Sequence, residues 1–237
     1  LVDDGEIVCT GCDCSGEAPF ATATTLTCTD AVISPGLING RVSASFSYNP
    51  PFDNADRYGQ RHDWRRGNRG STQLSTSFNG GSGQVTWEEL RSVMAGVTST
   101  VGSGNRDGMV RNLDRNSGFA SRTPTDIDTF PLGDANGAQL DSGSAYPKVE
   151  DQTPPFSAVW RVAEGSDAVA RNEFLWFSGT GSGSVDVLEA PIAIDSGAGL
   201  NFDDIVNTVS RGTRLVWTPR SDTSLYGNTA MVPVFDA

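Results

Sequence analysis

Residues 57–70, "RYGQRHDWRRGNRG", bring the chemically most unusual side chains of the sequence together in one short stretch. Guanidinium groups form paired hydrogen bonds with carboxylates and phosphates, and aromatic faces stack on planar groups, so this stretch can bind phosphates, acidic glycans or single-stranded nucleic acid. It can also pair with the protein's own carboxylates, within the chain or on another copy, and we favour this interpretation. The candidate binding or interface residues are Arg57, Tyr58, Arg61, His62, Trp64, Arg65, Arg66 and Arg69.

The sequence contains one histidine, His62, and one lysine, Lys148, which restricts the catalytic sites that it can build. A Ser-His-Asp triad would have to use His62, and no G-x-S-x-G nucleophile elbow accompanies it. Schiff-base chemistry would have to use Lys148. We therefore assign no catalytic residue and expect a protein that is not an enzyme.

A pair of carboxylates that hydrolyses a glycosidic bond is the enzymatic alternative. Acidic side chains on expected strands could form such a pair, although most acidic side chains of a β protein face water. The candidates are Glu164, Glu173, Asp186 and Glu189. A glycan-binding module that uses exposed Trp64 and Tyr58 is a second alternative.

All four cysteines lie near the start of the sequence, at Cys9, Cys12, Cys14 and Cys28. Structural zinc sites usually combine two Cys-x-x-Cys pairs, and here a single pair stands without a nearby histidine. A thioredoxin-type site needs a helix directly after Cys-x-x-Cys, and the residues that follow are turn-like. We favour two disulfides, with Cys28 joined to Cys9 or Cys12, in an oxidising compartment.

Residues 131–143, "PLGDANGAQLDSG", are rich in Asp, Asn and Gly, and such loops can bind calcium through oxygen atoms. The weak candidate ligands are Asp134, Asn136 and Asp141. Their spacing is not that of an EF-hand, and we favour a plain turn. No other cofactor is expected.

Turn-forming residues recur at short intervals and separate apolar stretches of strand length. In residues 40–49, Val42, Ala44, Phe46 and Tyr48 alternate with polar residues, as on a half-buried strand. Strands without regular intervening helices predict a mainly β fold, an antiparallel β-sandwich or jelly roll. The expected strands are 40–49, 71–78, 157–163, 173–178, 184–194, 213–218 and 230–235.

Two short amphipathic helices interrupt this pattern, at about 86–98 and 201–211. The first is expected to start with a capping box of Thr86 and Glu89, and the second with Asn201 as its N-cap. Both are expected to lie over a sheet or to close the end of a barrel.

We expect one β-rich domain over residues 1–237, with a disulfide-pinned segment at 1–34 and a loop-rich region at 103–156. The formal net charge is −12, which argues against general binding to nucleic acid or to anionic membranes. No apolar run approaches the length of a membrane span. The sequence begins at Leu1, and we expect a mature chain after processing.

These features together favour a structural protein that assembles with copies of itself or with other subunits. We expect an extracellular surface structure or particle, such as a filament, a surface layer or a virion component. Contacts would use strand edges and the Arg-rich stretch 57–70. The alternative is the secreted glycan-binding module or carbohydrate-active hydrolase described above.

Overall fold

A computed structural model divides the chain into two compact units, Leu1–Pro35 and Gly36–Ala237. The residues that it describes are 1–4, 6–11, 13–27, 30, 34–41, 44, 56–76, 80–102, 106, 108–115, 123–147, 157–181, 184–189 and 191–227. In this part of the chain, no helix has the length and hydropathy needed to cross a membrane.

The first unit contains little regular structure. β1 (Val2–Asp3) and β2 (Glu6–Ile7) form a two-stranded antiparallel sheet, and the 3₁₀-helix η1 (Ala18–Thr22) follows. These elements are too short to bury a core of their own, because each leaves its side chains largely exposed. A covalent link supplements them.

This link is a disulfide between Cys9 and Cys14, which confirms that the cysteine cluster contains a disulfide. Cys12 and Cys28 lie outside the described residues. The expected bond between Cys28 and Cys9 is incompatible with this pairing, because Cys9 is already bonded to Cys14. The disulfide thus joins two cysteines five residues apart and closes a short loop.

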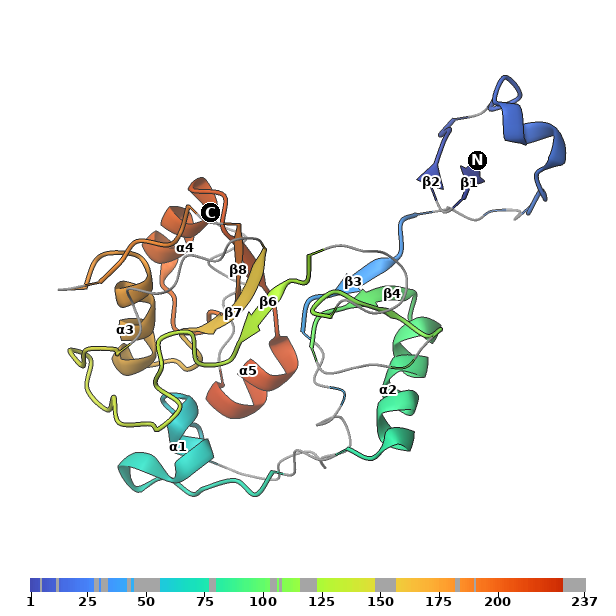
Figure 1. Cartoon of the computed structure of the whole chain (residues 1–237). Coiled ribbons are helices and arrows are strands. Elements are labelled where there is room, and N and C mark those ends of the chain that lie inside the picture. The colour runs from blue at the N-terminus through green and yellow to red at the C-terminus, as the bar shows by residue number, and fades with distance from the viewer. Residues whose placement is uncertain are drawn as a thin grey trace. The chain divides into compact units, whose positions relative to one another are not determined.

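The second unit contains a four-stranded sheet in which all strands run parallel, in the spatial order β6-β7-β8-β9 (Figure 1). Its strands are β6 (Asp126–Asp128), β7 (Ala158–Val162), β8 (Ile192–Ser196) and β9 (Arg214–Val216). Parallel neighbours require a crossover, and helices α3 (Ala168–Phe177) and α4 (Phe202–Ser210) belong to the connections after β7 and β8. The carboxyl ends of the four strands therefore lie along one edge of the sheet.

One face of this sheet carries the hydrophobic core. Alternate residues of β7 are buried, and the residues between them, Val159 and Arg161, are only partly buried. The Trp160 ring packs edge-to-face on Phe177 of α3 with ring centroids 5.7 Å apart, and Ile205 of α4 belongs to the same cluster. Helices α3 and α4 thus cover the face opposite Val159 and Arg161.

A second, smaller sheet in this unit is also parallel, with the order β3-β4-β5. Its strands are β3 (Leu37–Asn39), β4 (Val97–Thr100) and β5 (Arg111–Asn112). The connection from β3 to β4 contains α1 (Arg61–Arg66), the 3₁₀-helix η2 (Asn68–Gly70) and α2 (Ser82–Met94). Helix α5 (Pro219–Tyr226) follows β9 of the larger sheet.

The predicted antiparallel β-sandwich or jelly roll is wrong, because the second unit is an α/β structure built on two parallel sheets. The decisive difference lies at residues 173–178, which were expected as a strand and form the end of helix α3. Asp167 caps this helix by accepting hydrogen bonds from the N–H groups of Val169 and Ala170, at 3.0 and 2.9 Å. An apolar run such as "FLWF" fits one helical turn as well as a strand, so its length alone did not distinguish them.

Some expected elements are confirmed. Residues 157–163 contain β7 and residues 213–218 contain β9. The helix expected at 201–211 is α4, and the side chains of Asn201 and Asp204 form a capping box at its start.

Other expected elements are displaced or lie outside the described residues. The helix expected at 86–98 starts at Ser82, and Thr86 lies inside it and donates to the Ser82 carbonyl instead of capping. Among the described residues of the strand expected at 184–194, only those from Ile192 onward belong to β8, and the described part of 71–78 forms no strand. Outside the described residues lie most of 40–49 and all of 230–235.

Gly165 allows the segment before α1 to approach the larger sheet closely. Its φ is +151°, and a Cβ at this position would overlap the Gly59 carbonyl oxygen and lie 2.8 Å from the Ala170 side chain. Gln60 pairs with Gly165 as an isolated β-bridge. A side chain here would therefore force the two segments apart.

We expect Gly165→Ala to lower the free energy of unfolding by about 2–4 kcal/mol, because it combines overpacking with an unfavourable backbone conformation. Urea unfolding of the full chain measures this change. Gly83→Ala is the matched control, since a Cβ at this helical position would meet no described atom within 4 Å beyond its chain neighbours and its own helix backbone. The control should be neutral or up to about 1 kcal/mol more stable; equal effects of both substitutions would contradict the close approach.

Candidate functional site

The stretch 57–70 is fastened to the carboxyl end of β7 by its own backbone. The Arg61 N–H donates to the carbonyl of Glu164 at 3.0 Å, and the Ser166 N–H donates to the carbonyl of Gly59 at 2.8 Å. Both bonds join residues directly before α1 or at its start to the residues that follow β7. The fold thus places the Arg-rich stretch at an edge where parallel sheets commonly bind ligands.

Helix α1 begins with a capping box, which explains why a helix forms inside this polar stretch. The Gln60 side chain accepts from the His62 N–H at 2.9 Å, and Asp63 accepts from the Gln60 N–H at 3.1 Å. Arg69 then forms ion pairs with Asp63 and with Asp167, the N-cap of α3, at 2.5 and 2.7 Å. One guanidinium group therefore joins the starts of two helices.

Arg61 lies at the centre of the buried contacts of α1. Its side chain is fully buried and donates to both carboxylate oxygens of Glu173 on α3, at 3.0 and 2.5 Å. It also donates to the carbonyl of Thr129 after β6 and, at 3.2 Å, to the carbonyl of Arg161 on β7. Glu173 accepts a further bond from the Ala163 N–H at 2.8 Å. This ion pair links α1, α3 and the carboxyl ends of two strands.

His62 connects a buried carboxylate to a guanidinium group. Its Nε2 lies 3.0 Å from Asp134 Oδ2, and its Nδ1 lies 2.9 Å from a terminal nitrogen of Arg65. An arginine only donates, so Nδ1 accepts, and Nε2 carries the proton that is donated to Asp134. Burial lowers the pKa of His62, the bond to Asp134 raises it, and the charge of Arg61 lowers it further, with a net shift downward. The imidazole is therefore neutral at neutral pH.

Arg65 is held in place by this arrangement. Its guanidinium lies over the Phe130 ring, 4.3 Å from the centroid, while it donates to His62. Burial lowers the pKa of Arg65, as do the charges of Arg61 and Arg66, although an arginine remains charged at neutral pH. Among the described residues, none offers Arg65 a carboxylate at ion-pair distance. The side chain is thus a positioned cation without a direct carboxylate partner in the described part of the chain.

Arg65 and Trp64 line a cavity of about 590 Å³, within the range of small-molecule sites. The larger sheet contributes side chains at or after the carboxyl ends of its strands: Asp128, Thr129, Phe130, Glu164 and Asp195. The smaller sheet contributes residues from the corresponding ends of its strands: Gly40, Arg41, Val101, Gly102 and Asp114. The cavity therefore lies where the carboxyl ends of both parallel sheets come together.

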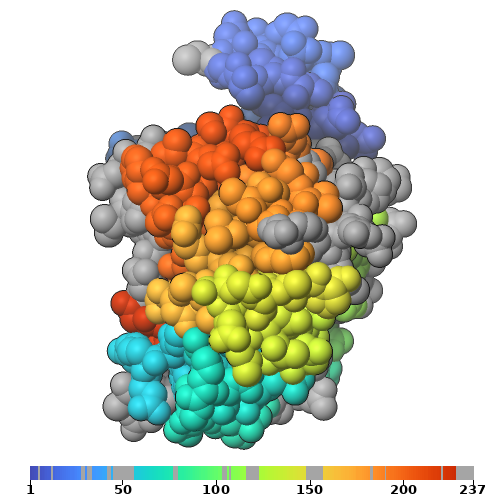
Figure 2. Space-filling model, turned by 90° about the vertical axis from the view of Figure 1, so that its left-hand side faces the viewer, coloured from blue at the N-terminus to red at the C-terminus, as the bar shows by residue number. Residues whose placement is uncertain are grey.

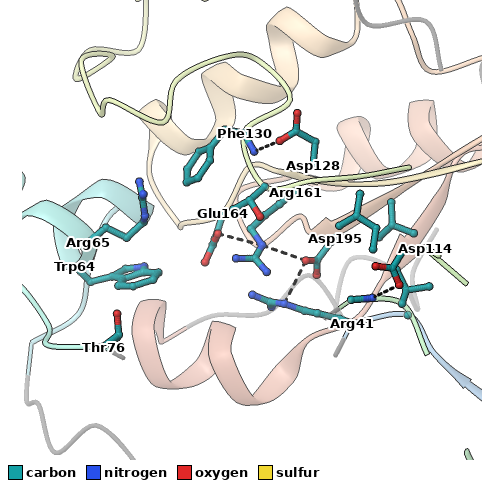
Figure 3. A pocket seen from close by; sticks show the side chains of 16 residues that line it. Arg41, Trp64, Arg65, Thr76, Asp114, Asp128, Phe130, Arg161, Glu164 and Asp195 are labelled. Carbon is teal, nitrogen blue, oxygen red and sulfur yellow. Dashed lines mark hydrogen bonds and ion pairs between the residues drawn. The ribbon is translucent and has the colours of Figure 1, made fainter. Parts of the chain in front are cut away.

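Four charged side chains of alternating sign form a row in this cavity, which we call the polar row: Arg41, Asp195, Arg161 and Glu164. Asp195 Oδ2 lies 3.2 Å from Arg41 Nε and 3.1 Å from Arg161 Nε. Glu164 Oε2 lies 3.5 Å from Arg161 Nε. Figure 3 shows the four head groups gathered at the centre of the cavity, with Trp64 at its side.

Trp64 and Glu164 are connected by a chain of hydrogen bonds through a buried tyrosine. The indole N–H of Trp64 donates to the hydroxyl oxygen of Tyr226 at 2.8 Å, and that hydroxyl donates to Glu164 Oε1 at 2.9 Å. Helix α5, which ends at Tyr226, thereby fixes the aromatic wall relative to the polar row. The Tyr226 hydroxyl therefore fixes the orientation of the Trp64 ring and of the Glu164 carboxylate.

Two strained residues flank the polar row. Ala163, directly before Glu164, has φ +55°, and Ser196, directly after Asp195, has φ +81°. Such values cost non-glycine residues about 1–3 kcal/mol and concentrate at functional sites. The strained residues lie where β7 and β8 end, each directly next to a carboxylate that lines the cavity, Glu164 or Asp195.

The structure separates the residues that were expected to act together in 57–70. It brings Trp64 and Arg65 to the cavity, buries Arg61 and His62 behind it, and also buries Tyr58, whose hydroxyl donates to the Thr72 carbonyl at 2.9 Å. The remaining arginines have partners elsewhere: Arg57 on Ser224, Arg66 on Ala135 and Arg69 on Asp63 and Asp167. Figure 2 shows the β6–β7 connection, in yellow-green, next to the 57–76 segment in cyan and teal.

The four carboxylates expected for a glycosidase do not share one site. Glu164 lines the cavity, and Glu173 is engaged by Arg61. Asp186 and Glu189 both pair with Arg211, at 2.8 and 3.3 Å. Of these four residues, only Glu164 is therefore placed to contact a ligand in the cavity.

The candidate calcium ligands have other surroundings. Asp134 is buried and engages His62, whereas Asn136 and Asp141 are exposed and take part in local turns. Burial raises the pKa of Asp134, but the Arg61 charge and the His62 bond outweigh it, and the net shift is downward. Within the described ranges, no group of three His, Cys, Asp or Glu side chains could hold a metal ion.

Sequence reasoning missed several cavity residues: Arg41, Asp114, Asp128, Phe130, Arg161 and Asp195. For some of them the sequence carried a signal, a charged residue near the end of a strand. Asp128 is the last residue of β6, and Arg161 and Asp195 are the second-last residues of β7 and β8. In a parallel sheet such positions share one edge, so recognising parallel strands would have grouped them.

A comparison of the chain with known protein families, with curated proteins and with solved structures finds no match in any of the three. The function is therefore argued from the geometry of the cavity alone.

We expect Arg61→Met to lower the free energy of unfolding by about 3–5 kcal/mol, because it leaves Glu173 buried without its partner. The double variant Arg61→Met/Glu173→Leu should lose less than the sum of the single changes, since it removes both charges. Urea unfolding of the four proteins measures the coupling. Arg211→Met, which breaks a surface ion pair, is the control and should change stability by less than about 1 kcal/mol. Additive losses would contradict the coupling.

We expect NMR to show His62 as the Nε2–H tautomer with a pKa below 6.5. The chain has one histidine, so its two imidazole nitrogens can be assigned without ambiguity. Because the unfolded chain takes up this proton at higher pH than the folded chain, the free energy of unfolding should fall as pH drops below 6.5. An Nδ1–H tautomer, or a pKa at or above 6.5, would overturn the arrangement around Arg65.

Proposed function

We propose that the chain binds a small anionic molecule in the cavity and that Arg65 is the anchor for its negative charge. The carrying observation is Arg65, a residue that lines the cavity and whose guanidinium is fixed by His62 and Phe130 without a carboxylate partner at ion-pair distance among the described residues. A charged group from a ligand can form paired hydrogen bonds with such a fixed fork.

The position of the cavity supports this proposal. Both sheets are parallel, and their carboxyl ends supply most of the lining. Ligands of α/β proteins bind at this edge because the loops that follow the strands surround it. The strained residues Ala163 and Ser196 lie at the same edge.

Two groups at the site, His62 and Glu164, favour recognition over catalysis. His62 has a partner at both ring nitrogens, so neither is free to exchange a proton with a ligand. Burial alone would raise the pKa of Glu164, but Arg161, Arg41 and Arg61 outweigh it and lower the pKa, which keeps Glu164 ionised and unable to donate a proton. Acid–base chemistry needs a group that can change its protonation state near neutral pH.

Self-association through the stretch 57–70 stays a prediction. Its arginines contact groups of the same chain, and Arg61 and Arg69 form ion pairs there. Because Arg61 and Arg69 are already paired within the chain, these contacts favour ligand binding in the cavity over self-association as the role of this stretch. Light scattering of the same samples reports the particle mass and thus tests the assembly hypothesis separately.

We expect Arg65→Leu to weaken the binding of a small carboxylate at least tenfold, because a charge-assisted hydrogen bond contributes about 1.5–3 kcal/mol. Isothermal titration with D-glucuronate, succinate, citrate and inorganic phosphate identifies the tightest anion and measures this change. Arg66→Leu is the matched control, because Arg66 is the next residue of the same helix, is exposed and donates to the Ala135 carbonyl. The proposal fails if both variants bind the tightest anion like the unchanged chain, or if no anion in the set binds.

A further inference from the structure

The polar row offers donors and acceptors in alternation. Arg41 and Arg161 donate, and Asp195 and Glu164 accept, with neighbouring charges 3.1 to 3.5 Å apart. A ligand group with a full charge would meet a like charge next to each opposite one. A hydroxyl group both donates and accepts, so adjacent hydroxyl groups can each contact one carboxylate and one guanidinium. This row is therefore complementary to a compound with several hydroxyl groups.

Two acceptors in this row lack a hydrogen-bond donor. Asp195 Oδ1 and Glu164 Oε2 are buried and have no hydrogen-bond partner within the described part of the chain. The residues themselves are 5% and 1% exposed, so bulk water does not solvate these oxygens freely. Buried acceptors without donors are rare in folded proteins. These two oxygens leave the polar row short of donors at the wall of the cavity.

Trp64 adds a flat apolar wall to the same cavity. Its ring orientation is fixed by the bond from the indole N–H to Tyr226, and the residue is only partly buried and lines the cavity. Figure 3 shows this ring beside the polar row, with Arg65 as the next residue of α1. The C–H face of a sugar ring packs on an aromatic face while its hydroxyl groups point sideways to polar partners.

We infer that the anion bound by Arg65 is a sugar acid, a ring with several hydroxyl groups and one carboxylate. The carboxylate binds Arg65, the hydroxyl groups bind the polar row, and one face of the ring packs on Trp64. This inference rests on the proposed function, which needs the anion alone, and it adds the hydroxylated ring.

The test compares ligands that each lack one feature, by isothermal titration of the full chain. The probes are D-galacturonate, with ring, hydroxyl groups and charge; D-galactose, without the charge; and cyclohexanecarboxylate, without the hydroxyl groups. We expect D-galacturonate to bind at least tenfold more tightly than either of the other two. Trigalacturonate distinguishes the two sources of a sugar acid. A site for the free sugar acid binds D-galacturonate more tightly than the trimer, and a site for the end of an acidic polysaccharide binds the trimer more tightly.

The outcomes separate the two proposals. Equal affinity for D-galacturonate and cyclohexanecarboxylate would overturn the sugar assignment and leave the anion site intact. Equal affinity for D-galacturonate and D-galactose would overturn the role of Arg65 and leave a sugar site. If none of the probes binds, the sugar assignment is overturned, and the anion proposal depends on succinate, citrate and phosphate.

Variants of the polar row provide a second readout. Asp195→Asn and Glu164→Gln keep the size of each side chain. Each should weaken the binding of D-galacturonate at least tenfold and leave the affinity for cyclohexanecarboxylate unchanged. Asp186→Asn is the control, because its carboxylate pairs with Arg211 outside the cavity. Circular dichroism confirms that each variant is folded. Unchanged D-galacturonate affinity in folded Asp195→Asn and Glu164→Gln would overturn the inference; if either variant unfolds, the comparison of ligands on the unchanged chain decides.

Discussion

The buried ion pair between Arg61 and Glu173 is the contact on which the rest of the site depends. A fully buried guanidinium is costly to desolvate, and it is retained here because acceptors from three segments satisfy it: the Glu173 carboxylate and the carbonyls of Thr129 and Arg161. Such a pair contributes little net stability, but alternative packings that break it are strongly disfavoured. It therefore fixes where α1 lies relative to α3 and the ends of β6 and β7, and α1 carries Trp64 and Arg65.

Parallel strands determine the remainder of the site. In the two parallel sheets of the second unit, strands β3 to β8 each place a residue at or near their carboxyl end in the cavity lining, so side chains far apart in the sequence become neighbours without long-range loops. Arg41 and Asp195 lie at the ends of strands in different sheets and are joined by an ion pair of 3.2 Å. The cavity is thus assembled from short, local extensions of a regular framework.

Local sequence patterns were sufficient for part of this structure. The N-cap of α4 and the alternation in β7 depend on neighbouring residues only, and both were predictable. Strands β5 and β6 have two and three residues, too few for any periodicity to appear. The pairing of Arg61 with Glu173 joins residues 112 positions apart, and nothing local distinguishes this buried arginine from exposed Arg66. The unusual composition of 57–70 indicated a site, but which arginine reaches the cavity depends on how α1 packs.

The alternation along β7 has an evolutionary consequence. Trp160 faces the core, and Arg161, the next residue, faces the cavity, so core packing and the proposed ligand contact are encoded at interleaved positions of one strand. A substitution on the cavity side leaves the packing beneath α3 and α4 in place. Ligand preference can therefore diverge among descendants of this chain while the scaffold is conserved, and selection would act on adjacent codons for different reasons.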